Sequence, residues 1–134
     1  MDRILGAPVA TLCVLVVGFA LAREVEAAAD GEVLFNTHCR NCHSMGAGDH
    51  RLGPSLHGII GKIAGGAAGF STYSGSLKGF AWDEATLDKF IAAPTSVAPN
   101  TSMIYPPVAD SAQRAAIIAF MKERSGAPAP ASTR

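Results

Sequence analysis

Two cysteines and one histidine lie within five consecutive residues, in the segment Cys39-Arg40-Asn41-Cys42-His43. The one other cysteine in the sequence, Cys13, belongs to an apolar stretch near the start of the chain that is expected to be removed. A structural zinc site would need a second pair of ligands, and a thioredoxin-like redox pair would need a βαβ unit. The sequence indicates neither, so these two uses of the cysteine pair are not favoured.

The spacing C-x-x-C-H is typical of covalent haem attachment, in which two thiols add to vinyl groups and the adjacent imidazole binds the iron. We therefore predict one haem c, bonded to Cys39 and Cys42, with His43 as an axial iron ligand. A chain of 134 residues has room for one small domain, whose own apolar core is limited. A large apolar cofactor would supply much of the missing core.

The second axial position would be filled by a side chain on the opposite face of the haem. Met103 lies 60 residues after His43, in a proline-rich segment, 95–107, that is predicted to be stiff and extended. Met45 is too close to His43 to reach the other face, and Met121 has the helical spacing of a core residue. Met103 is therefore the predicted ligand, and a soft thioether there favours reduced iron.

Two residues of the segment 53–58 are candidates for supporting roles. We predict that the carbonyl oxygen of Pro54 accepts the second ring proton of His43 and so fixes the tautomer of this ligand; an ordinary turn proline is the alternative. His57 either holds its loop by hydrogen bonds or, as the less favoured alternative, ligates iron in place of Met103. Solvent exposure is expected for the two remaining histidines, His38 and His50.

The first 29 residues have the features of a secretory signal peptide. Arg3 precedes an apolar run of 19 residues, 4–22, and three alanines at 27–29 suggest cleavage before Asp30. The run is also long enough to span a bilayer, so a retained membrane anchor is the alternative. We therefore predict a periplasmic location, either free after cleavage or anchored to the membrane and facing the periplasm.

The predicted mature chain is almost neutral. Of the 11 basic and 11 acidic residues of the whole sequence, nine and eight lie beyond residue 29. This balance gives no indication of nucleic-acid binding, and it predicts that charge steers partners only weakly.

Residues 30–125 are predicted to form one all-α domain with three main helices. Asp30, Asp83 and Asp110 are expected to cap these helices at their amino ends. The helices should end near Arg40, before Pro94 and near Arg124. The segment 44–79 is rich in glycine, serine and alanine and predicts long loops, and residues 126–134 predict a disordered tail.

Several separate segments also occur in the order found in one protein family. Over nearly all of residues 31–122, the chain resembles mitochondrial cytochrome c and its bacterial relatives, the class I c-type cytochromes. Besides the haem motif, the matching positions are Gly31, Phe35, Gly53-Pro54-Ser55-Leu56-His57-Gly58, Gly69-Phe70-Ser71, Trp82, Pro94 and Pro99-Asn100-Thr101-Ser102-Met103-Ile104. The resemblance implies a small cytochrome c fold, in which three main helices and long loops wrap around one covalently attached haem.

The resemblance also implies roles for particular side chains. The first and last helices should cross where Gly31 lets Phe35 approach Phe120, and Trp82 and Tyr73 should bind a buried haem propionate. The haem-contacting residues implied in addition to the cysteines are Pro54, Tyr73, Trp82 and Thr101.

The sequence departs from the family pattern in a few places. One extra residue separates Phe70 from Tyr73, and Phe90 stands where many relatives have a tyrosine. Asn100 replaces a glycine, and Ser102 replaces the lysine before the methionine ligand. The lysine ring of the family is reduced to the plausible remnants Lys62, Lys78, Lys89 and Arg51.

The resemblance implies a monomeric one-electron carrier and no enzyme activity. Its partners would be respiratory or photosynthetic complexes, such as a quinol-oxidising complex as donor and a terminal oxidase or similar acceptor. The alternative is a dedicated electron-acceptor haem subunit of one periplasmic dehydrogenase. An enzyme or gas sensor would need an open iron position, which a methionine ligand at Met103 argues against.

Overall fold

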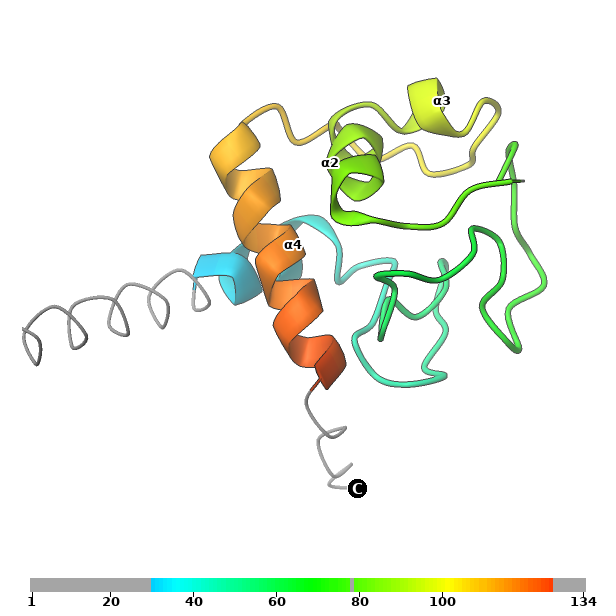
Figure 1. Ribbon diagram of the computed structural model, residues 1–134, viewed down its shortest axis with the longest axis horizontal. Helices are drawn as coiled ribbons and strands as arrows, with labels where there is room; N and C mark the ends of the chain where they lie inside the picture. The colour runs from blue at the N-terminus through cyan, green and yellow to red at the C-terminus, as the bar shows by residue number, and fades with distance from the viewer. Residues whose placement is uncertain (1–29, 78, 127–134) are drawn as a thin grey trace, which may run out of the picture.

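The computed structural model describes residues 30–77 and 79–126 (Figure 1). The predicted signal peptide (1–29), most of the predicted tail (127–134) and Lys78 lie outside this description. The described chain is helical over residues 30–38, in α2 (Glu84–Ala92), in α3 (Pro94–Val97) and in α4 (Ser111–Gly126). Within these ranges, strand-like pairing is limited to one antiparallel bridge between Ile63 and Ala81. The all-α prediction is therefore confirmed.

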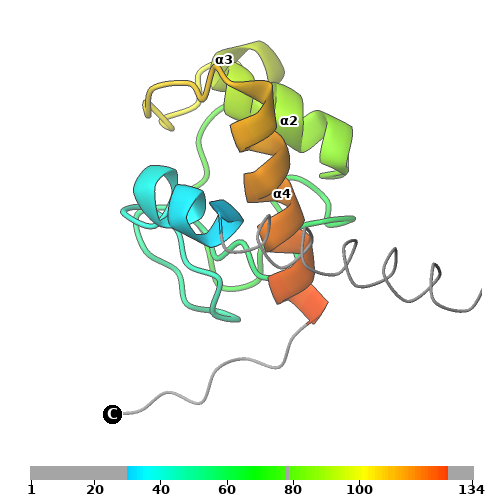
Figure 2. The same ribbon diagram turned by 90° about the vertical axis from the view of Figure 1, so that its left-hand side faces the viewer.

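Helix 30–38 and α4 cross in direct contact (Figures 1 and 2). Gly31 makes this contact possible, because a Cβ atom there would lie 2.8 Å from Cβ of Phe120 and against the carbonyl oxygen of Ala116. Next to it, the rings of Phe35 and Phe120 pack with their centroids 5.3 Å apart. The crossing implied by the resemblance is confirmed, and it joins the two ends of the domain.

The three predicted helix caps have different outcomes. Asp30 is itself helical, so the prediction that it caps the first helix is wrong. Asp83 accepts a hydrogen bond of 2.6 Å from the amide three residues further on and caps α2. Asp110 accepts from the amides two and three residues further on, at 2.8 and 3.3 Å, directly before α4. These carboxylates satisfy amides that have no intrahelical acceptor.

Pro94 ends α2, as predicted, and it also begins α3. The sequence predicts an extended segment over 95–107, and the structure corrects this, because residues 94–97 form a helical turn. Proline favours the first position of a helix, where its fixed φ fits and its missing amide is not needed. Residues 98–107 run on without helix, and we call them the strap.

Arg114 joins the chain just after the strap to the helices. Its Nε lies 2.7 Å from Oδ1 of Asp88 in α2, and its Nη1 donates to the carbonyl oxygens of Val108 and Ala109 at 2.9 and 2.8 Å. The guanidinium is largely buried, with 11% of the side chain exposed. Arg114 of α4 therefore connects the residues that follow the strap to α2.

His50 is half-buried and both of its ring nitrogens bond to the protein, contrary to the prediction of a solvated side chain. Its Nδ1 accepts a hydrogen bond of 3.0 Å from the amide of Ser55, so its Nε2 carries the proton and donates to the carbonyl oxygen of Ala68 at 2.9 Å. Its ring also packs on Phe70, with the centroids 5.6 Å apart. The side chain therefore connects two loops that lack regular secondary structure.

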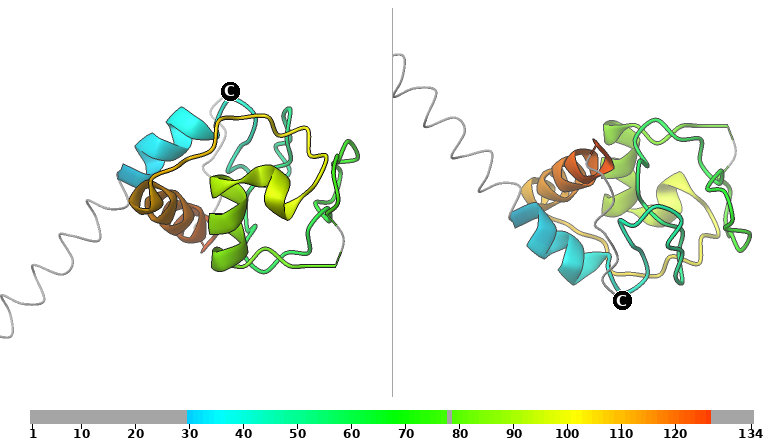
Figure 3. Two further views of the ribbon diagram at one scale, coloured as in Figure 1. Left: turned by 90° about the horizontal axis from the view of Figure 1, so that it is seen from above. Right: turned by 90° about the horizontal axis from the view of Figure 1, so that it is seen from below.

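The loops and the helices occupy different sides of the molecule (Figure 3). Helix 30–38 and α4 lie together on one side, and the loop segment 44–77 lies on the other, with α2 between them. The part of the chain that the structure describes contains no helix with both the length and the apolar character required to cross a membrane.

Candidate haem site

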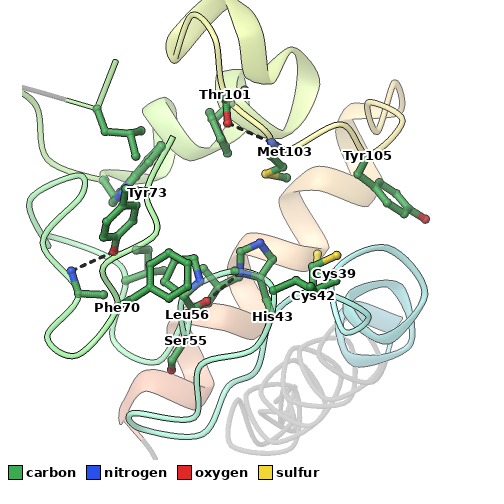
Figure 4. Close-up of a pocket in the computed structure, with 18 of the residues that line it drawn as sticks. Cys39, Cys42, His43, Ser55, Leu56, Phe70, Tyr73, Thr101, Met103 and Tyr105 are labelled. Carbon is green, nitrogen blue, oxygen red and sulfur yellow. Dashed lines mark hydrogen bonds between the residues drawn. The ribbon is translucent and has the colours of Figure 1, made fainter. Parts of the chain in front are cut away.

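A cavity of about 540 Å³ lies between helix 30–38, the loops, α2, the strap and α4. This volume falls within the range of roughly 300–1,000 Å³ found for cofactor and small-molecule sites. All of the site residues predicted from the sequence line it, namely Cys39, Cys42, His43, Pro54, Tyr73, Trp82, Thr101 and Met103. Figure 4 shows several of these side chains around the open centre of the site.

The two cysteines lie directly after helix 30–38. The amides of Cys42 and His43 both donate to the carbonyl oxygen of Cys39, at 3.1 and 2.9 Å, and this tight turn brings both thiols to the cavity. Burial, with a smaller contribution from Cys42, raises the pKa of the Cys39 thiol to about 11. Redox-active thiol pairs instead need a lowered pKa, so the environment argues against thioredoxin-like chemistry.

His43 is held in one orientation by its neighbours. Its Nδ1 lies 2.8 Å from the carbonyl oxygen of Pro54, which can only accept, so Nδ1 carries the proton. Burial lowers the pKa of His43, and the hydrogen bond to Pro54 opposes this shift with a smaller effect. The imidazole is therefore neutral at neutral pH, with the lone pair on Nε2 free to bind a metal.

Gly53 packs against the face of the same ring. A Cβ atom at this position would lie 2.7 Å from Nδ1 and 2.9 Å from Nε2 of His43, closer than real Cβ contacts allow. The amide of Gly53 also donates to the carbonyl oxygen of Cys42 at 2.8 Å. We call residues 39–54 the motif wall, because the haem motif, Gly53 and Pro54 together form this side of the cavity.

Met103 lies on the opposite side of the cavity, in the strap. Its side chain and that of His43 point toward one another across the open centre (Figure 4). The amide of Met103 donates to Oγ1 of Thr101 at 3.2 Å, which stabilises the local turn of the strap. A nitrogen and a thioether sulfur thus face the same space from two sides.

The competing ligand candidates lie elsewhere. His57 does not line the cavity, and its carbonyl oxygen accepts a hydrogen bond of 2.8 Å from Nζ of Lys62. Met45 also lies outside the cavity lining and packs against the core. Met121 borders the cavity from α4, but it is 2% exposed and belongs to the core, as predicted.

Aromatic side chains also contribute to the cavity lining. Trp82 is 7% exposed and packs edge-on between Phe80 and Phe90, with both centroid distances 4.9 Å. Tyr73 packs edge-on against Phe70 at 4.9 Å, and its hydroxyl accepts a hydrogen bond of 3.0 Å from the amide of Ala67. Tyr73 therefore reaches the cavity despite the extra residue before it.

Two of the lining residues that were not predicted from the sequence, His38 and Tyr105, pack against each other. Their rings meet edge-on with centroids 6.0 Å apart, and the Tyr105 hydroxyl donates to the carbonyl oxygen of Thr37 at 3.3 Å. His38 is half-buried, and within the described chain its buried Nδ1 has no hydrogen-bond partner, so the prediction of a solvated side chain is wrong. Their positions in the sequence, directly before Cys39 and two residues after Met103, could have indicated that they lie near the cavity.

The donor set fits a covalently attached haem. Two thiols and a neutral, oriented imidazole lie on one wall, a thioether lies on the other, and a glycine leaves room for the imidazole ring. Imidazole and thioether are the axial ligand pair of electron-transferring haem proteins. Within the described residues, no cluster of three or more histidine, cysteine or acidic side chains offers a site for a metal ion held by the protein alone.

Comparison with known proteins gives the same result. The family model described as cytochrome c matches residues 28–125. A cytochrome c of Nigella damascena is 40% identical over 99 residues, which cover 71% of this chain and 87% of that protein. A cytochrome c2 iso-2 of Magnetospirillum fulvum is 42% identical over 85 residues, covering 63% and 88%. The solved structure of cytochrome cH from Methylobacterium extorquens has a TM-score of 0.65 and 37% identity, and covers 72% of this chain and 97% of its own. The resemblance predicted from the sequence is confirmed: the chain belongs to the cytochrome c family, whose members bind one covalent haem c.

Proposed function

We propose that this cytochrome c is a one-electron carrier whose haem is bonded to Cys39 and Cys42 and ligated by His43 and Met103. The haem supplies the redox chemistry, because its iron takes up and releases one electron. The observation that carries the proposal is the arrangement of an oriented imidazole and a thioether that point toward one another across one cavity.

The protein's own residues would bind the cofactor and tune it. Pro54 keeps the proton on Nδ1 of His43, so that Nε2 is the ligand atom. Met103 contributes a soft sulfur, which favours the reduced state and raises the potential. Trp82, Tyr73 and Thr101 provide polar atoms on the cavity lining, and we propose that they contact the haem, with Trp82 and Tyr73 at a propionate.

A carrier is favoured over an enzyme or a gas sensor for a structural reason. Because His43 and Met103 lie on opposite sides of the cavity, they would together hold the haem iron and leave it no open position. A small molecule could then reach the iron only by displacing a ligand. This arrangement therefore favours an electron carrier over an enzyme or a gas sensor.

We propose that the partners are other redox proteins in the periplasm, with a quinol-oxidising complex as donor and a terminal oxidase or similar acceptor. The names of the relatives, cytochrome c and cytochrome c2, support a general carrier over a dedicated subunit of one dehydrogenase. Removal of residues 1–29 would release the domain as a monomer, and retention of this segment would anchor it to the membrane.

Carbon monoxide binding tests this proposal. The reduced wild type should bind carbon monoxide poorly, and its oxidised form should show the methionine-to-iron charge-transfer band. The variant Met103→Ala should keep its haem by intact mass, lose the band, bind carbon monoxide and have a lower potential. The control Met45→Leu, outside the cavity lining, should behave as the wild type. Ready binding by the wild type without the band would contradict the proposal.

A further inference from the structure

Two serines, Ser74 and Ser102, connect the loop segment 44–77 to the strap. The amide of Ser102 donates to Oγ of Ser74 at 2.7 Å, and the two hydroxyl oxygens lie 2.6 Å apart. Both residues line the cavity, and Ser102 directly precedes Met103 in the chain. The pair therefore acts on the strap one residue before the proposed iron ligand.

The backbones of the loop and the strap are also in direct contact. A Cβ atom at Gly75 would lie 2.9 Å from both Cα and N of Thr101, and Gly75 has a φ of +78°. The next residue, Ser76, donates its amide hydrogen to the carbonyl oxygen of Pro99 at 3.0 Å. The short segment 74–76 thus lies along the strap with no side chain between them.

These contacts matter because the strap has few others near Met103. Within the described chain, residues 99–104 make hydrogen bonds outside the strap only to Ser74 and Ser76. The next contact along the strap is the long hydrogen bond of 3.3 Å from the hydroxyl of Tyr105 to helix 30–38. The segment 74–76 therefore supplies the hydrogen bonds that connect the part of the strap carrying Met103 to the rest of the described chain.

We propose that Ser74 is a positioning residue, which together with Ser102 forms a latch that holds Met103 toward the haem. Opening of the latch would move the strap and expose the sixth iron position to external ligands. The inference rests on the proposed function, since it assigns the latch to the strap that carries the axial methionine. The resemblance does not imply it, because the residue at Ser102 departs from the family pattern.

The two serine hydroxyls contribute different numbers of hydrogen bonds to the latch. Ser74 takes part in both side-chain hydrogen bonds of the latch, whereas the hydroxyl of Ser102 takes part in one. The variant Ser74→Ala therefore removes the whole latch, and Ser102→Ala leaves the bond from the Ser102 amide in place. The double variant should resemble Ser74→Ala, because nothing remains for the second substitution to remove.

The test uses the oxidised holoprotein and imidazole as the external ligand. The rate at which imidazole abolishes the methionine-to-iron charge-transfer band reports opening of the strap. A hydrogen bond contributes about 0.5–1.5 kcal/mol, and about 1.4 kcal/mol is tenfold in an equilibrium constant. We expect the rate to rise roughly 5- to 150-fold in Ser74→Ala, which loses two hydrogen bonds, and roughly 2- to 12-fold in Ser102→Ala, which loses one.

Two further variants separate positioning from general destabilisation. Ser96→Ala removes a single hydroxyl hydrogen bond of 2.7 Å in α3, outside the strap, and should leave the rate unchanged. Ser74→Thr keeps a hydroxyl at the latch and should restore a rate close to that of the wild type. The amide of Ser102 should exchange with deuterium faster in Ser74→Ala than in Ser96→Ala.

Four outcomes would overturn the latch, the pairing of its two serines or the proposed function, and they can be told apart. An imidazole rate in Ser74→Ala equal to that in Ser96→Ala would overturn the latch, while the band in the wild type would leave the proposed function intact. Multiplying effects in the double variant would overturn the pairing of Ser74 with Ser102. Equal exchange of the Ser102 amide in Ser74→Ala and Ser96→Ala would also overturn the latch. If the wild type lacks the charge-transfer band, the proposed function fails.

Discussion

The motif wall and the strap lie on opposite sides of the cavity, and they differ in what holds their iron-facing side chains. His43 is held by its own segment, with a hydrogen bond to Pro54 eleven residues away and close packing against Gly53. Met103 is held by a segment with no regular structure, whose nearby anchors are Ser74 and Ser76. His43 is thus positioned by contacts within its own segment, whereas Met103 is positioned by contacts between distant parts of the chain.

This difference fits the chemistry of the two sides. The motif wall would be joined to the haem by two covalent bonds and one iron ligand, so it has to be in place before the cofactor can be oriented. The strap would contribute one sulfur ligand, which can leave and return without loss of the cofactor. A carrier needs the strap closed in use, and its hydrogen bonds to Ser74 and Ser76 contribute to keeping it closed.

The largest effect is expected from a substitution in the motif wall, Gly53→Ala. The added Cβ would meet the ring of His43, which cannot move away without breaking its hydrogen bond to Pro54. Overpacking of this kind costs about 3 kcal/mol. Denaturant unfolding of the holoprotein should show this loss of free energy, together with a changed haem absorption spectrum.

The control for this prediction is Gly126→Ala, at the end of α4. A Cβ atom there would have nothing within 4 Å, so the free energy of unfolding should change by less than about 0.5 kcal/mol. A loss of stability in Gly53→Ala no larger than in this control would mean that the motif wall is as adaptable as the strap, and the comparison would fail.

Local patterns in the sequence predict the residues of the motif wall, whereas contacts between distant segments leave no such pattern. Cys39, Cys42 and His43 form one pentapeptide, and the bond to Pro54 follows from a short separation along the chain. The sequence does not predict the contact of His50 with Ala68, because Ala68 lies 18 residues away in a segment with no periodic pattern. The prediction for His50 is therefore a solvated side chain. Such a contact appears only when two irregular loops come together in space.

The strap illustrates the same limit. Its prolines predict a stiff segment and place Met103 within it, but they do not indicate that residues 94–97 form α3. Likewise, the bond from Tyr105 to Thr37 joins residues 68 positions apart, and no local feature of either residue predicts it. The sequence therefore predicts Met103 as the ligand, but it does not predict the contacts that position this residue.

A smaller effect is expected in the strap, at Asn100. This residue has a φ of +61°, and the amide of Thr101 donates to the carbonyl oxygen of Ala98 at 3.1 Å, closing a turn in which Asn100 occupies the left-handed position. Asparagine tolerates this conformation better than most residues, and glycine adopts it without strain. This explains how Asn100 can replace the glycine of the family pattern.

We expect Asn100→Ala to destabilise the holoprotein by about 1 kcal/mol, because alanine pays the full cost of the left-handed conformation. Asn100→Gly should change the free energy of unfolding by less than about 0.5 kcal/mol. Chemical denaturation of the two variants gives both values. A loss in Asn100→Ala as large as that in Gly53→Ala would show that the strap is as rigid as the motif wall.

The smallest effect is expected from salt concentration on the rate of electron transfer, because the motif wall and the strap should respond alike. Leu52 of the motif wall and Ile104 of the strap line the cavity with 81% and 92% of their surface exposed. The nearby positive charge of Arg51 is balanced in part by Asp49, at 3.7 Å. Both walls therefore present apolar atoms beside the haem site, and such atoms do not respond to the ionic screening that weakens charge–charge attraction.

Electron transfer to an isolated terminal oxidase should accordingly change by less than about threefold between roughly 0.05 and 0.5 M salt. Leu52→Lys and Ile104→Lys should each introduce a salt dependence, since either places a charge next to the site of docking. Val33→Lys, on helix 30–38 and outside the cavity lining, should not, although Val33 is also exposed at 64%. If the wild-type rate falls by orders of magnitude over this range, charge steers docking after all. If Ile104→Lys introduces a salt dependence and Leu52→Lys does not, docking involves the strap alone. The motif wall and the strap would then also differ in their contact with the partner.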